Sequence, residues 1–386
     1  MKQVLKKRII EANNIDTTKP ILSLVLDMNS LLKNSMVDRR TNTKGEVYGA
    51  VMQVLIKIKK FLEMRDWNFI YACYDGYNSG ILRWNIYEDY KIARGKDFGG
   101  ASKMTDYDRY MSEYAKKVIE YSKRKRGIRD ERDDEEDFER QREIVFECLE
   151  NLFVRQFIYD SVEGDDLIAY KVINKKPIEK ICIVTSDRDL TQLINDDVCV
   201  YLLDMRKFIT PESHIKIMGY PHYNVVIKKI LCGDDSDSIK GIKGIGEKTF
   251  FNLYPQAKTE KIDLERILAI SNEDVNKRLS EHKKPLRAHE NVLNRVTDGC
   301  QGQNIFEINE RLIDLSKPML TDEAKDGLND ELYAPIDPEG RGFMELYSII
   351  NKYGIDDLKD DDKFSKFFSP FNKLIDKENK YRLEFK

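Results

Sequence analysis

The sequence has 386 residues, of which 41% are hydrophobic and 10% aromatic, so the chain can bury a sizeable core. Charged residues reach 34%, but Lys and Arg (65) nearly balance Asp and Glu (68), and the net charge is −3. The chain therefore lacks the global positive charge of a non-specific nucleic-acid coat, although segregated basic patches remain open. No apolar run approaches the ~20 residues of a membrane span, so no membrane partner is expected.

Cysteine usage and the first residues of the chain indicate a reducing compartment. The six cysteines show no C-x-x-C spacing, and with only four histidines they make a poor zinc site. The opening MKQVLKKRIIEANN lacks the continuous apolar region and cleavage site of a signal peptide. We expect a cytoplasmic protein.

Short apolar runs in the first quarter of the chain are typical of buried strands. One covers residues 21–26 and ends at Asp27, and the next covers 69–74 and ends at Asp75. Between them, apolar residues recur every three or four positions over 47–62, which predicts a helix.

Two more strands are predicted further along the chain. Residues 181–185 are followed by Asp187, and residues 198–203 precede Asp204. Strands that alternate with helices predict an α/β fold with a mostly parallel central sheet flanked by helices. Ligands bind at the carboxyl edge of such sheets, which is where these aspartates would lie. For any one of them, a simple preference of Asp for strand ends and caps is an equally good explanation.

Further acidic motifs suggest a metal site. Counting the strand-end residues, the candidate carboxylates are Asp27, Asp75, Glu163, Asp165, Asp166, Asp187, Asp189, Asp234 and Asp237. So many carboxylates cannot share one place unless they bind cations, because like charges raise one another's pKa. Oxygen ligands select Mg²⁺ or Mn²⁺, and two such ions commonly serve phosphodiester hydrolysis. The alternative is that these residues do not converge.

A basic segment follows the second strand. Arg83, Lys91 and Arg94 fall at helical spacings, with Tyr87 and Tyr90 between them. Such cations can neutralise a phosphate, and the tyrosines can stack on unpaired bases. An ordinary surface helix would show the same pattern.

Residues 97–145 interrupt the α/β rhythm with dense charge. From Lys116 to Arg132 there are eight basic and three acidic residues. The basic half can contact a phosphate backbone, or the segment can be a solvated insertion. The candidate contacts are Lys116, Lys117, Lys123, Arg124, Lys125 and Arg126.

A glycine-rich motif, G-I-K-G-I-G-E-K-T, occupies residues 241–249. Glu247 breaks the P-loop spacing and a helical pattern precedes the motif, so a nucleotide-binding loop is not expected. We interpret it as a hairpin between helices whose backbone approaches a duplex phosphate. Its candidate residues are Lys243, Gly244, Gly246, Lys248 and Thr249.

The order of these motifs resembles the structure-specific 5′-nucleases, also called flap endonucleases or 5′–3′ exonucleases, which have a PIN-like core. The resemblance covers residues 21 to about 255. It rests on D-x-N, D-G, Y-K-x-x-R, E-x-D-D, T-S-D-x-D-x-x-Q-L and G-D-x-S-D-x-I-x-G-I-x-G-I-G-x-K-T. The stretch S-G-I-L-R-W-N-I-Y-E-D-Y-K is most similar to the phage ribonuclease H branch.

The resemblance implies roles for the candidate residues. Asp27, Asp75, Glu163 and Asp165 would hold one Mg²⁺, replaceable by Mn²⁺. Asp165, Asp187, Asp189, Asp234 and Asp237 would surround a second, with Asp166 as a ligand or an outer-sphere group. Lys91 would contact the scissile phosphate, helped by Arg83 and Arg94. A K⁺ ion would bind at the glycine hairpin.

The resemblance also implies a domain plan. Residues 1–20 form an extension, 21–204 the nuclease core, and 97–145 a helical arch within it. Residues 205–300 form a helical duplex-binding region, and 301–386 a C-terminal extension without an assigned role. Phe364, Phe367, Phe368 and Phe371 in that extension are typical of a packed helix face.

The implied activity is metal-dependent hydrolysis of 5′ ends, flaps or RNA primers next to duplex DNA, in phage DNA replication within a host bacterium. Its partners would be DNA, RNA–DNA hybrid and a single-strand-binding or other replication protein, with the enzyme as a monomer. The alternative is a catalytically idle protein that binds DNA junctions.

Overall fold

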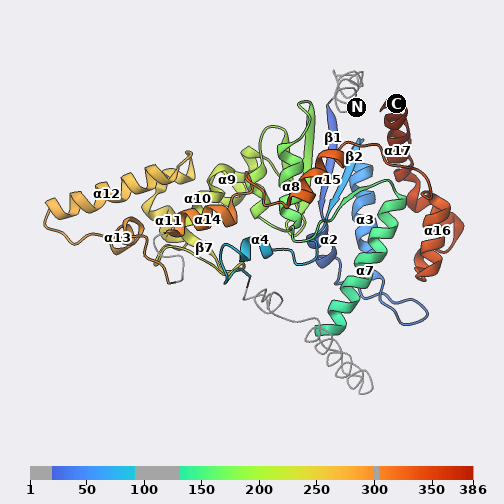
Figure 1. Cartoon of the computed structure of the whole chain (residues 1–386), viewed down its shortest axis with the longest axis horizontal. Helices are drawn as coiled ribbons and strands as arrows, with labels where there is room; N and C mark the ends of the chain where they lie inside the picture. Colours follow the sequence, from blue (N-terminus) through green and yellow to red (C-terminus); the bar gives the residue numbers. More distant parts are fainter. Residues whose placement is uncertain (1–19, 92–130, 299–303, 386) are drawn as a thin grey trace, which may run out of the picture.

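A six-stranded sheet forms the centre of the computed structural model, which describes residues 20–91, 131–298 and 304–385 (Figure 1). The strand order is β3-β2-β1-β4-β5-β6, in which the first five strands are parallel and β6 is antiparallel. The strands are β1 (Ile21–Asp27), β2 (Phe69–Cys73), β3 (Arg155–Phe157), β4 (Glu179–Thr185), β5 (Val198–Leu202) and β6 (Lys207–Ile209). The predicted fold class is confirmed.

Helices cover both faces of this sheet because the strands are apolar on both sides. One face carries α2 (Met28–Lys33), α3 (Gly49–Met64), α7 (Glu131–Asn151), α16 (Phe343–Lys352) and α17 (Asp361–Phe385). The other carries α8 (Gly164–Ile173) and α15 (Asp322–Glu331). Within β1, Leu24 and Leu26 contact the first layer and Val25 the second, which is the alternation expected of a strand.

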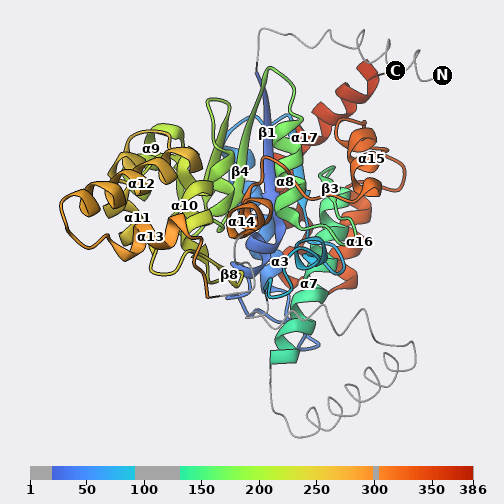
Figure 2. The same ribbon diagram turned by 60° about the vertical axis from the view of Figure 1, so that its left-hand side comes forward.

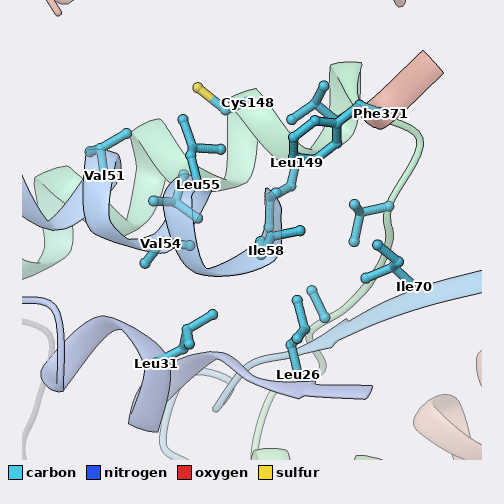
Figure 3. Packing of buried hydrophobic residues seen from close by; sticks show 14 of the residues in the cluster. Leu26, Leu31, Val51, Val54, Leu55, Ile58, Ile70, Cys148, Leu149 and Phe371 are labelled. Carbon is cyan, nitrogen blue, oxygen red and sulfur yellow. The ribbon is translucent and has the colours of Figure 1, made fainter. Parts of the chain in front are cut away.

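The helix predicted over 47–62 is α3, and its apolar side packs against the sheet and α7 (Figure 3). Val54 and Ile58 lie between α7 and the strand residues Leu26 and Ile70, and all four are fully buried. The four predicted strands are present within one residue of their expected ends, except that β4 begins at Glu179. The sequence analysis missed β3 and β6, which have three residues each and no periodic pattern.

A separate helical unit projects from the β5 side of the sheet (Figures 1 and 2). Its helices are α10 (Val225–Cys232), α11 (Glu247–Leu253), α12 (Leu264–Ser280), α13 (Arg287–Leu293) and α14 (Ile305–Ile313). They share a core that includes Leu231, Phe250, Ile267 and Phe306. Because α14 packs in this core, the helical unit continues past residue 300, where the C-terminal extension was expected to begin.

The rest of the 205–300 region is not purely helical. It includes β6, the helix α9 (Pro211–Met218), and a two-stranded antiparallel pair of β7 (Gly233–Asp234) and β8 (Ile239–Lys240). Residues 241–246 of the glycine motif lie between β8 and α11, and 247–249 form the first turn of α11, so a short strand precedes the motif where a helix was expected. No helix in the described ranges has the length and apolar character needed to cross a membrane.

The C-terminal helices are built into the core around the central sheet. Phe364, Phe368 and Phe371 of α17 are buried in the cluster that contains α3 and α7, which fits their interpretation as a packed helix face. Further along α17, Glu378 forms a buried ion pair with Arg155 of β3. The fold therefore depends on residues far beyond the motifs.

Candidate active site

Two strand-end aspartates are fixed by hydrogen bonds from neighbouring elements. Asp27 ends β1 and caps α2, since one of its carboxylate oxygens accepts the Ser30 N–H at 3.0 Å. Its other oxygen accepts the hydroxyl of Thr185 at the end of β4, at 2.6 Å. Asp75 follows β2 and accepts the Gly164 N–H at the start of α8, at 2.8 Å. These bonds join β1, β2, β4 and α8 at the carboxyl edge of the sheet.

A second pair of carboxylates lies at the same edge. Asp165 is in the first turn of α8, and Asp187 follows β4. Burial raises the pKa of Asp165 well above its usual range, and the negative charges of Asp187, Asp27 and Asp75 raise it further. Burial likewise raises the pKa values of Asp27 and Asp187. We call Asp27, Asp75, Asp165 and Asp187 the sheet-edge group.

Gly76 lets the loop after β2 run close to the backbone of Tyr159, in the segment that follows β3. A Cβ at this position would lie 1.7 Å from the carbonyl oxygen of Tyr159. We expect Gly76→Ala to displace the loop that carries Asp75 and to lower the free energy of unfolding by about 1–3 kcal/mol, measured by denaturant unfolding. Gly246→Ala is the matched control, since a Cβ there meets nothing within 4 Å and φ is −95°. Equal stability of both variants would contradict this account.

A third set of carboxylates comes from a 3₁₀ turn and from the β7–β8 hairpin. Asp189 begins the 3₁₀ turn η2 (Asp189–Leu193), Asp234 is in β7, and Asp237 lies in the turn before β8. Oxygen atoms of the three lie within 4.8 Å of one another. We call them the hairpin group. Asp189 also donates its backbone N–H to Asp187 at 2.7 Å, which links this group to the sheet-edge group.

Glu163 lies beside these carboxylates but is held by basic side chains. It pairs with Lys91 and Arg83 and accepts the Tyr90 hydroxyl at 3.0 Å. Burial raises the pKa of Glu163, but Arg83 and Lys91 outweigh this effect and bring the pKa to about 2. Glu163 therefore stays ionised.

The structure changes the expected role of Arg83 and favours one of the two roles expected for Asp166. Arg83 is buried, and its guanidinium binds Glu163, Asp166 and the Leu312 carbonyl. It is thus not available to a phosphate in this structure. Asp166 is 1% exposed and accepts hydrogen bonds from the Arg83 guanidinium and the Met319 N–H. These contacts agree with the expected outer-sphere role and not with that of a direct ligand.

The expected stacking of Tyr87 and Tyr90 on bases is also wrong for this structure. Both rings are 2% exposed and pack against Ile239 and Leu312. The cause is local: α4 (Ile81–Trp84) is a single turn, so the helical spacing assumed for this segment ends at Trp84. The chain then turns until Lys91, which has φ 57° and donates its backbone N–H to the Asp237 carbonyl.

The remaining candidates are either exposed or outside the described residues. Lys243 and Lys248 are exposed beside the glycine hairpin with Gly244 and Gly246, and Thr249 is half-buried in α11. Two sets of expected contacts fall outside the described ranges. They are Arg94, expected to help at the scissile phosphate, and the arch residues Lys116, Lys117, Lys123, Arg124, Lys125 and Arg126. Only the end of the predicted arch, from residue 131, is described, as the start of α7.

Sequence reasoning missed one charged residue of the site. Lys229 of α10 pairs with both Asp189 and Asp234. It stands five residues before Asp234, which is not a helical spacing, so no periodic pattern marks it.

The donor set suits hard divalent cations. Every candidate ligand is a carboxylate oxygen, the donor type that Mg²⁺ and Mn²⁺ prefer. Burial, and to a smaller extent the neighbouring carboxylates, raise the pKa values of Asp27, Asp165 and Asp187, so bound cations would stabilise their ionised forms. Beside Asp187, the Ser186 hydroxyl is buried and has no hydrogen-bond partner in the described part of the chain. The residues fit a site for divalent ions.

Comparison with known proteins places this arrangement in a family. Residues 23–219, about half of the chain, match the family model "5′-3′ exonuclease, N-terminal resolvase-like domain". The chain belongs to this 5′–3′ exonuclease family. The family predicted from the motifs is therefore confirmed.

Individual relatives cover only part of this exonuclease-family chain. It is 33% identical over 153 residues to the thermostable DNA polymerase I of Thermus caldophilus, which covers 39% of the chain and 18% of the relative. It is also 33% identical over 121 residues to a 5′-3′ exonuclease of Bacillus subtilis, which covers 30% of the chain and 41% of the relative. The chain thus matches less than half of the length of these relatives.

Solved structures share the fold over almost the whole chain. The flap endonuclease of bacteriophage T5, in a pseudo-enzyme–product complex with DNA and metal ions, superposes with a TM-score of 0.54. The match covers 93% of this chain and 99% of that one at 14% identity. The T5 5′-exonuclease with bound zinc gives a TM-score of 0.52 at 14% identity, with 92% and 99% coverage. At these identities the comparison establishes the fold.

Proposed function

We propose that this protein is a divalent-metal-dependent 5′-nuclease that hydrolyses phosphodiesters at 5′ ends, flaps or RNA primers next to duplex DNA. The observation that carries the proposal is the convergence of the sheet-edge group and the hairpin group at the carboxyl edge of one sheet. Family membership and the metal ions and DNA named for the T5 structures support it.

The carboxylates would hold the ions in two neighbouring sets. Asp27, Asp75 and Asp165, with Glu163 behind them, would hold one ion, and Asp187 with the hairpin group would hold the other. Bound divalent ions would supply Lewis acidity for attack of water on the phosphodiester.

Lys91 is the candidate for contact with the scissile phosphate. Its ammonium group pairs with Glu163, and its backbone N–H donates to the Asp237 carbonyl at 2.8 Å, which connects it to residues of both sets. Arg83 and Tyr90 hold Glu163 in place from the other side. When a phosphate enters, the Lys91 ammonium group can leave Glu163 and pair with the phosphate instead, so that Lys91 keeps an anionic partner.

The helical unit would grip the duplex through the glycine hairpin, with a K⁺ ion bound there. We further propose action on flap DNA and RNA–DNA hybrid in phage DNA replication, as a monomer that works with a single-strand-binding or other replication protein. One labelled set of flap, nicked, gapped and RNA–DNA substrates with Mg²⁺ tests the activity. Binding of these substrates without any cleavage would favour the idle junction-binding alternative.

Lys243 and Lys248 are expected to act in duplex binding. Among the described residues Lys243 pairs with the exposed Asp298 alone, so its removal should cost the fold little. Replacing both lysines by Ala should weaken binding to all sequences equally and reduce the salt slope by about 1.8, or ~0.9 per phosphate contact. Fluorescence anisotropy over a salt series measures both.

The control pair is Lys366→Ala with Lys373→Ala, two exposed residues of α17 on the other side of the molecule (Figure 1). These substitutions should leave the salt slope unchanged. Normal affinity together with lost cleavage in the Lys243/Lys248 variant would place those lysines in chemistry instead.

A further inference from the structure

The side chain of Lys229 lies within the hairpin group. It extends from α10, and its ammonium nitrogen lies 2.5 Å from an Asp234 oxygen while also contacting Asp189. The side chain is 16% exposed, and those of Asp189 and Asp234 are 26% and 11% exposed. This is a partly buried three-residue ion cluster in which one lysine bridges two carboxylates that come from different elements.

The neighbouring lysine on the same helix has a different environment. Lys228 pairs with the exposed Glu247 of α11 at 2.8 Å and lies over the Tyr220 ring. Its recorded partners, Glu247 and Tyr220, lie outside the hairpin group, so it provides a matched comparison for the bridging lysine.

We propose that Lys229 is an internal cation that occupies the hairpin group when no divalent ion is bound there, and that a divalent ion must displace it. This inference rests on the proposed function, because it concerns the same carboxylates. Asp189 and Asp234 direct their oxygens to the ammonium group, and a divalent ion needs those oxygens as ligands. The ammonium charge also repels a cation that approaches the pair.

The displacement has two opposite consequences. Without a divalent ion, Lys229 offsets the repulsion between Asp189 and Asp234, so it stabilises the folded protein. With a divalent ion, the pairs with Lys229 have to be broken, so it weakens ion binding at the hairpin group. Lys229 thereby sets the ion concentration at which this group fills.

The other proposed ion set, formed by Asp27, Asp75 and Asp165, lacks such a competitor within the described residues. Asp27, Asp75 and Asp165 are not ion-paired to any Lys or Arg in residues 20–91, 131–298 and 304–385. Arg83 and Lys91 pair with Glu163, and Arg142 donates to the backbone carbonyl of Asp75 at 2.6 Å rather than to its carboxylate. An ion can enter there without displacing a side chain. We therefore expect ordered filling, with the set of Asp27, Asp75 and Asp165 filled first and the hairpin group filled at a higher concentration.

Ion binding to the full chain without DNA tests the proposal. Mg²⁺ titration calorimetry measures the affinities, and Mn²⁺ electron paramagnetic resonance counts the bound ions. In the wild type they should reveal one class of tighter ion-binding sites and one class of weaker sites. Lys229→Met should tighten the weaker class by about tenfold or more and leave the tighter class unchanged. Lys229→Arg, which keeps the charge, and Lys228→Met should both bind like the wild type.

Thermal unfolding gives an independent readout. In EDTA, Lys229→Met should melt below the wild type, and added Mg²⁺ should raise its melting temperature by more than that of the wild type. Lys229→Gln removes the charge but keeps a hydrogen-bond donor. It should bind ions like the Met variant, and it replaces the Met variant in both experiments if the Met variant does not fold.

Equal or weaker ion binding by Lys229→Met and Lys229→Gln would overturn the inference while leaving the proposed function intact, provided that the wild type binds ions and cleaves DNA. A wild type that binds no divalent ion would overturn the proposed function, and the inference with it.

Discussion

Asp187→Asn is expected to lower the cleavage rate by about 10³-fold or more, because a carboxylate between the two metal sets is lost. The folded structure should persist. The Asn side chain has the same shape, and its carbonyl oxygen can still accept the Asp189 N–H that Asp187 accepts at 2.7 Å. Single-turnover cleavage of a labelled 5′ flap with saturating Mg²⁺ measures the rate.

Binding of the same flap should be largely unchanged in this variant, since the proposed duplex contacts lie at the glycine hairpin. Asp204→Asn is the control: Asp204 also follows a strand, but it is exposed and pairs with Arg188 at 3.4 Å. Its cleavage rate should match the wild type. Near-normal activity of Asp187→Asn would show that this carboxylate takes no part in the reaction.

Glu378→Ala is expected to destabilise the protein by about 3–5 kcal/mol, because it leaves a buried arginine without its counter-charge. The two guanidinium nitrogens of Arg155 bind the Glu378 oxygens at 2.8 and 2.9 Å, and the side chains are 4% and 1% exposed. Glu378 also accepts the Ile336 N–H at 2.9 Å. Chemical denaturation followed by circular dichroism gives the free energy of unfolding.

Two comparisons separate the ion pair from a general effect on α17. Glu384→Ala, on the same helix in an exposed 3.9 Å pair with Lys380, should change stability by no more than about 0.5 kcal/mol. Replacing both Arg155 and Glu378 by Leu should cost less than Glu378→Ala alone, since no buried charge is left unpaired. A loss below 1 kcal/mol for Glu378→Ala would mean that the C-terminal helix does not hold β3 in this way.

The sheet and its acidic edge were predictable because they depend on local pattern. Apolar runs that end at Asp27, Asp75 and Asp187 specify both the strands and the edge at which they stop. Once the strands pair in parallel, the three residues lie at the same edge of the sheet, so their proximity follows from the strand pattern alone.

The environments of Arg83, Tyr90 and Lys229 were not predictable in the same way. Helical spacing after Asp75 suggested an exposed basic face, but α4 ends at Trp84 and the segment folds inward against β8 and α14. Lys229 meets Asp189 only because α10 packs beside η2, a contact between residues 40 positions apart. Such pairings arise from tertiary packing, which leaves no periodic trace in the sequence.

The central claim is that the two carboxylate groups bind divalent ions that the nuclease reaction requires. Cleavage of a labelled 5′ flap by the wild-type chain, first in excess EDTA and then after addition of Mg²⁺, tests it most directly. The account predicts no cleavage in EDTA and full recovery with Mg²⁺. Cleavage at the full rate in excess EDTA would contradict it.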